Sequence, residues 1–192
     1  MINLVPESDP NLKKVPSLWD FKNPLNIIRR LETEEVTDTP DVQDELKAPD
    51  LYNILVQHMV YYRGLGLAAN QIGIPFKAFS MMVTDKDVIC CFNPEIIKES
   101  DETIVIKEGC LSYPLLFLKI KRPKEIWVKY KNADGDEIDA HFEGLAARTF
   151  QHEMDHMNGT VFLDRVSKGS LRLARRKQRT LLKKERRNGR KS

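Results

Sequence analysis

At 192 residues the chain can form one domain with a hydrophobic core, and its length gives no reason for a second domain. Hydrophobic residues make up 41% of it and charged residues 31%, and no apolar run approaches the roughly 20 residues that a membrane helix needs. The first residues show no basic stretch followed by an apolar one, and three cysteines do not suggest a disulfide framework. We therefore expect a cytoplasmic protein without a membrane partner, in the host cytoplasm if the source is viral; an organellar origin stays open.

The net charge of +3 hides a division of the chain into an acidic body and a basic tail. Residues 168–192 hold 12 of the 31 Lys and Arg residues but only one of the 28 Asp and Glu residues, so the remainder carries a net charge of −8. Many of the acids gather in the segment 21–50. We predict a main body over 1–167, with an acidic, mobile surface segment at 21–50, and a basic helical tail over 168–192.

A short helix is predicted near Leu25–Leu31, within the acidic segment. A longer helix is predicted directly after that segment. Asp50 is a suitable N-cap, and the helix is expected to stop at Gly64. Its apolar residues recur with the 3.6-residue period of a helix: Leu51, Ile54, Leu55, Met59 and Tyr62.

Short β-rich runs then follow up to about Trp127. They lie at 76–83, 87–92, 103–107 and 116–120, and Val128–Tyr130 with the turn sequence Asn132-Ala133-Asp134-Gly135 continues the pattern. Cys90 and Cys91 fall in such a run and are expected to be core residues. Another helix is predicted from Gly144 to Met157, ending at Asn158-Gly159.

The tail is predicted to form a helix over 170–187 that is capped by Ser170. Its apolar residues near one face are Leu171, Ala174, Leu181 and Leu182. Strands preceded and followed by separate helices indicate an α+β fold. We expect mixed or antiparallel sheets around a central helix at 144–157, an additional N-terminal helix and a basic C-terminal helix.

The central helix carries the sequence Gln151-His152-Glu153-Met154-Asp155-His156. Two histidines four residues apart lie on the same face of a helix, so both imidazoles can bind one metal ion. Glu153 can handle the protons of a water molecule at that ion. The motif therefore predicts metal-dependent hydrolysis, with a zinc endopeptidase as its most familiar form.

A catalytic metal needs a third protein ligand, and the chain offers few after the motif. Phe162 stands where a downstream third histidine would be expected, which leaves Asp164 and Glu185 as the downstream carboxylates. Before the motif, Cys110 follows Gly109 at the end of a predicted strand. A thiolate there would complete a Cys-His-His set with an open fourth position, whereas the alternative for Cys110 is a core thiol.

Together, three segments resemble the motifs of peptide deformylases in order and spacing. They are GLGLAANQ at 64–71, EGCLS at 108–112 and QHEMDHMNG at 151–159, and the resemblance spans about 50–167. It implies an α+β enzyme that removes the formyl group from the N-terminal formyl-methionine of new polypeptides and releases formate.

The resemblance also implies roles for individual residues. Cys110, His152 and His156 would bind one divalent metal ion, Fe²⁺ in the cell, with Zn²⁺, Ni²⁺ or Co²⁺ as alternatives. Glu153 would be the general base and then the acid, and the Gln71 amide and the Leu111 N–H would form the oxyanion hole. The residues expected to contact the N-formyl-methionyl peptide are Leu65, Gly66, Gly109, Leu145 and Thr149.

Two rival interpretations and one further partner stay open at this point. A zinc endopeptidase would take Asp164 or another group as its third ligand. A ribosome- or RNA-binding module without activity would use the basic tail alone. In the deformylase interpretation, the tail 168–192 is expected to dock on ribosomal RNA, although a solvated basic helix packed on the body explains it equally well.

Overall fold

The computed structural model describes residues 2–22 and 46–188, and the short helix expected near Leu25–Leu31 lies outside these residues. An N-terminal arm leads into helix α1 (Ala48–Tyr61). Strands β1 (Gly66–Ala68), β2 (Ala78–Met82), β3 (Val88–Glu99), β4 (Thr103–Cys110), β5 (Tyr113–Pro123), β6 (Glu125–Lys131) and β7 (Glu137–Glu143) follow. The chain ends with α2 (Gly144–Met157) and α3 (Lys168–Asn188). The predicted α+β class is confirmed.

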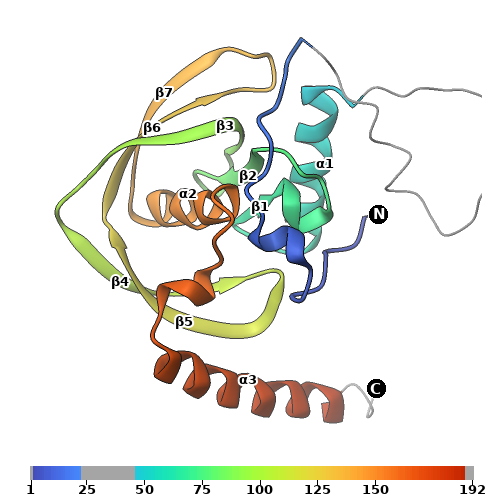
Figure 1. The fold of residues 1–192 in the computed structure, drawn as a ribbon, viewed down its shortest axis with the longest axis vertical. Helices are drawn as coiled ribbons and strands as arrows, with labels where there is room; N and C mark the ends of the chain where they lie inside the picture. Colours follow the sequence, from blue (N-terminus) through green and yellow to red (C-terminus); the bar gives the residue numbers. More distant parts are fainter. Residues whose placement is uncertain (1, 23–45, 189–192) are drawn as a thin grey trace, which may run out of the picture.

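The strands form two antiparallel sheets that enclose the central helix. The larger sheet has the order β1-β2-β3-β6-β7, and β4 pairs with β5 in a separate hairpin. Helix α2 lies between the large sheet and the hairpin, and α3 runs along the outer side of the hairpin (Figure 1). The motif-bearing helix is thus at the centre of the fold, as the sequence predicts.

Helix α2 is fixed on the large sheet by its apolar face. Phe150 is fully buried and packs edge-on against Phe79 and beside Phe142, with ring centroids 5.1 and 5.7 Å away. Met154 and Met157 extend the same cluster. Since truncating a buried Phe to Ala typically costs about 3–5 kcal/mol, this face sets where the histidines on the other side of the helix point.

Helix α1 starts two residues before the predicted cap. Lys47 occupies the N-cap position, and the Asp50 side chain accepts a hydrogen bond from the Lys47 N–H (3.1 Å). Leu51, Leu55 and Met59 are buried, as the periodicity predicts. Asp50 therefore supports the first turn from inside the helix rather than preceding it.

Helix α3 also differs in detail from its prediction. It begins at Lys168. The predicted cap, Ser170, lies inside the helix and donates its backbone N–H to the hydroxyl of Ser167 (3.2 Å). Leu171 and Ala174 pack with the inner residues of the hairpin, whereas Leu181 is exposed. The buried position on this face is Gln178, which donates to the Pro114 carbonyl (2.8 Å).

Two strands were not predicted. β7 has the sequence EIDAHFE, whose charged residues alternate with half-buried ones at the edge of the sheet, and β1 has only three residues. Within the described part of the chain, no helix is long and apolar enough to cross a membrane.

Candidate metal centre

Three predicted ligands from two elements meet inside the fold. Cys110 ends β4, while His152 and His156 lie on successive turns of α2, and their ligand atoms all lie within 4.8 Å of one another. The Cys110 Sγ is 3.5 Å from the His156 Nε2, about the separation expected for sulfur and nitrogen ligands of one tetrahedral ion. The donor set and its spacing therefore fit a divalent metal.

The surroundings keep His156 in the form that a metal needs. His156 is 1% exposed, and its Nδ1 has no hydrogen-bond partner among the described residues. Burial, together with the neighbouring His152, lowers the pKa of His156 to about 3. Since a metal binds the neutral imidazole, this ring is ready to coordinate at neutral pH.

The second histidine is oriented by a buried carboxylate. Oε2 of Glu108 lies 3.0 Å from Nδ1 of His152, which leaves Nε2 for the ligand cluster. Arg122 contacts both oxygens of Glu108 (2.7 and 2.9 Å), and Arg148 contacts one (2.8 Å). Burial alone would raise the pKa of Glu108, but these hydrogen bonds outweigh it and hold the pKa far below its usual value.

The same network continues behind the helix. Arg122 bonds Asp155 (2.9 Å), and Arg165 bonds Asp155 with two nitrogens. This network and the role of Glu108 were not predicted from the sequence, although Glu108 and Asp155 belong to the quoted motifs. Because the pairs join residues from 10 to 44 positions apart, only the folded chain reveals them.

Glu153 is buried beside the ligand cluster without a full set of partners. It is 3% exposed, its Oε2 has no hydrogen-bond partner among the described atoms, and burial raises its pKa to about 7. Gly66 lies so close that a Cβ there would collide with the Glu153 carboxyl group and come within 2.9 Å of Thr149 Cγ2. The glycine thus makes room for the carboxylate.

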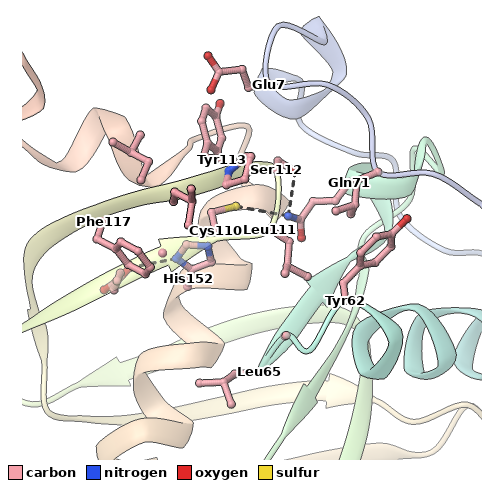
Figure 2. A pocket seen from close by; sticks show the side chains of 18 of the residues that line it. Glu7, Tyr62, Leu65, Gln71, Cys110, Leu111, Ser112, Tyr113, Phe117 and His152 are labelled. Carbon is pink, nitrogen blue, oxygen red and sulfur yellow. Dashed lines mark hydrogen bonds and ion pairs between the residues drawn. The ribbon is translucent and has the colours of Figure 1, made fainter. Parts of the chain in front are cut away.

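Gln71 presents its amide nitrogen to the same place. Its Oε1 accepts the Ala68 N–H (2.9 Å), so Nε2 points toward Ser112 Oγ (3.1 Å) and Cys110 Sγ (3.4 Å), as Figure 2 shows. Leu111, in the turn between β4 and β5, packs so closely on Gly64 that a Cβ there would lie 2.7 Å from its Cδ1. Ser112 is a further site residue that was not predicted from the sequence.

One cleft of about 1050 Å³ is lined by Gln71 and Ser112 as well as by two of the three predicted ligands. The five residues predicted to contact the substrate, Leu65, Gly66, Gly109, Leu145 and Thr149, line it together with Cys110, His152 and Glu153. Asp164 lies elsewhere and pairs with Lys13 on the surface (3.1 Å). Asp164, one of the third ligands that the endopeptidase interpretation would take, therefore lies outside the Cys-His-His cluster.

The α+β fold and a Cys-His-His cluster next to a buried glutamate define a hydrolase with a metal-binding site. The family model for polypeptide deformylase matches residues 24–172. The chain belongs to the polypeptide deformylase family, and it is an enzyme of this family.

Individual relatives agree with this assignment. The peptide deformylase of Thermotoga maritima is 46% identical over 123 residues, which cover 64% of this chain and 74% of the relative. That of Wolbachia pipientis from Culex pipiens is 37% identical over 157 residues, covering 76% and 87%.

Solved structures show the same fold. A peptide deformylase from Legionella pneumophila superposes with a TM-score of 0.75 at 28% identity, covering 97% of this chain and 98% of that one. A probable peptide deformylase from Synechococcus phage S-SSM7 gives 0.69 at 28% identity, covering 86% and 100%.

Proposed function

We propose that this enzyme hydrolyses the formyl group of N-formyl-methionyl peptides, using one divalent metal ion held by Cys110, His152 and His156. The observation that carries the proposal is the Glu153 carboxyl group, buried in one cleft with Cys110, His152 and the Gln71 amide. The ligand atom of His156 lies within 4.8 Å of those of Cys110 and His152. Fe²⁺ is the proposed native ion, with Zn²⁺, Ni²⁺ and Co²⁺ as substitutes. Such an ion would supply a Lewis acid and lower the pKa of a water molecule bound to it.

The chain's own residues carry the protons and the charge. Glu153 takes a proton from the attacking water, whose oxygen adds to the formyl carbon. The Gln71 Nε2 and the backbone N–H of Leu111 donate hydrogen bonds to the oxyanion that forms, each worth roughly 3–4 kcal/mol where such donors have been removed from other enzymes. Glu153 then protonates the departing nitrogen as the carbon–nitrogen bond breaks, which yields formate and a free amino terminus.

The peptide is proposed to bind in extended form between two sheet edges. β1 pairs only with β2, and β4 only with β5, so each of these strands has an edge without a described strand partner. Gly66 on β1 and Gly109 on β4 line the cleft. Backbone pairing there would hold the chain, while the methionine side chain lies beside Thr149 on α2.

The direct test is formate release from formyl-Met-Ala by protein purified without oxygen. Wild-type protein should release formate, and Glu153→Gln should lower kcat by about 10²–10⁴-fold because the proton carrier is lost. Glu102→Gln, at an exposed glutamate, is the matched control and should match wild type. Full activity in Glu153→Gln would contradict the proposed role.

A second proposal concerns the binding partner of α3. It also concerns where the enzyme acts, which we propose is the cytoplasm. One face of the helix is docked on the hairpin, and its outer side is basic. The exposed basic residues are Lys168, Arg172, Arg176, Lys177, Arg179, Lys183, Lys184, Arg186 and Arg187. We propose that this side binds ribosomal RNA through its phosphates.

Glutamine substitutions test this better than truncation, because a 1–168 truncation also removes the packed Leu171 and Ala174. Replacing Arg172, Arg176, Arg179 and Lys183 should weaken ribosome binding and flatten its dependence on salt. Four exposed lysines elsewhere, Lys14, Lys86, Lys119 and Lys121, give a control with the same change in charge. Equal binding by both quadruple variants, or by the truncated chain, would contradict the proposal.

A further inference from the structure

Three large apolar side chains at the active-site cleft are unusually exposed. Leu65 is 47%, Phe117 44% and Leu145 58% exposed, and all three line the same cleft as Cys110 and His152. They come from three separate elements: the segment before β1, the strand β5 and the first turn of α2 (Figure 2 labels Leu65 and Phe117). We call these three residues the apolar collar.

The Phe117 ring is fixed in place by its neighbours on the hairpin. A Cβ at Gly109 would lie only 3.0–3.1 Å from two ring carbons, so the absence of a side chain there lets the ring lie against the β4 backbone. The Lys107 Nζ lies 4.4 Å from the ring centroid. The ring therefore forms a defined part of the cleft wall, with a positive charge beside it.

The cleft is larger than the first residue of a substrate requires. Its volume of about 1050 Å³ lies at the upper end of the range of roughly 300–1,000 Å³ that is usual for small-molecule pockets. In an extended peptide, successive side chains point to opposite sides of the backbone. When the methionine side chain lies beside Thr149, the next side chain is therefore directed elsewhere along the cleft.

We propose that the apolar collar binds the side chain of the residue that follows formyl-methionine, with Phe117 as the main specificity-determining residue. This inference rests on the proposed function and adds a substrate class to it: peptides with an apolar second residue. Covering the collar removes apolar surface from water, which favours such peptides. A basic second residue would leave the collar exposed and meet the charge of Lys107.

The test compares kcat/KM for four tripeptides with formyl-Met-Ala as the reference substrate. Formyl-Met-Leu-Ser should exceed formyl-Met-Lys-Ser by about tenfold, mainly through KM, since the contact holds substrate and transition state alike. Formyl-Met-Ser-Leu and formyl-Met-Ser-Lys, which move the variable residue to the third position, should differ much less. Phe117→Ser should reduce the tenfold preference to about twofold, whereas Phe117→Leu should retain most of it.

Leu173→Ser is the matched control, because Leu173 is 56% exposed on α3 and does not line the cleft. It should keep the wild-type preference. If Phe117→Ser does not fold in a thermal unfolding assay, Leu145→Ser at the mouth of the cleft tests the same collar.

The outcomes are distinguishable. Equal rates for the leucine and lysine peptides, a preference that survives the loss of Phe117, or a preference confined to the third position would each overturn the collar. Failure to release formate from formyl-Met-Ala would overturn the proposed function itself.

Discussion

Oε2 of Glu108 lies 3.0 Å from Nδ1 of His152, and two buried arginines hold the same carboxylate. One glutamate thus orients a proposed metal ligand and is a counter-charge for both Arg122 and Arg148, each of which is 4% exposed. The position of the metal site and the stability of the core therefore depend on the same side chain.

Replacing Glu108 with alanine should affect both properties. Arg122 and Arg148 would lose a buried counter-charge, so the free energy of unfolding should fall by about 3–5 kcal/mol. Loss of the partner of His152 should weaken metal binding by about 10–100-fold. Urea unfolding and competition with a chelator measure the two effects.

The control for this variant is Glu102→Ala, which breaks an exposed ion pair with Lys124. Such pairs contribute about 0–1 kcal/mol, so stability should hardly change. Equal effects of the two substitutions on metal binding would show that Glu108 does not orient His152.

Gly66→Ala should damage catalysis while leaving the metal in place. The added Cβ would collide with the Glu153 carboxyl group and press on Thr149. A displacement of about 1 Å of a catalytic group can cost about 10²-fold in rate, and kcat should fall by that order. Metal content should stay at the wild-type level, since the atoms nearest to the added Cβ belong to Glu153 and Thr149 and not to a proposed ligand.

Gly169→Ala is the glycine control, because the added Cβ would make only an ordinary contact with Ser167. It should keep wild-type kcat. A Gly66→Ala enzyme with unchanged kcat would mean that Glu153 does not need its observed position.

Cys110→Ala should remove the metal. It eliminates one of three ligands from a cluster whose donor atoms lie within 4.8 Å of one another, so metal per chain, measured by elemental analysis, should fall sharply. Cys90→Ala, at a core cysteine 4% exposed, should keep its metal. Retention of the metal in Cys110→Ala would point back to a different third ligand.

The parts of the fold with strong local signals were predictable. The bounds of α2 are those predicted, because Asn158 and Gly159 end the helix and its His-Glu pattern marks the interior; Gly159 adopts φ +65°. The edge strand β7 was not predicted although its charged and apolar residues alternate with the period of a strand, and the three-residue β1 is too short to give a pattern.

The cluster of Cys110, His152 and His156 was predictable from motif chemistry, whereas its supporting contacts were not. Two histidines four residues apart on a helix indicate a metal site from the sequence alone, and the lack of a suitable downstream ligand pointed to Cys110 as the third. Which of many arginines would pair with Glu108 depends on the crossing of β4, β5 and α2, a tertiary relationship that spacing does not encode. The proposed role of the exposed Phe117 in substrate binding likewise follows only from its position in the cleft.

The most direct test of the central claim is to identify the products when anaerobically prepared protein acts on formyl-Met-Ala-Ser. Mass spectrometry, with an enzymatic assay for formate, should show one formate for each molecule of intact Met-Ala-Ser. Cleavage of the Met-Ala or Ala-Ser bond would indicate a peptidase instead. Unchanged substrate with each of Fe²⁺, Zn²⁺, Ni²⁺ and Co²⁺ would contradict the proposed deformylation.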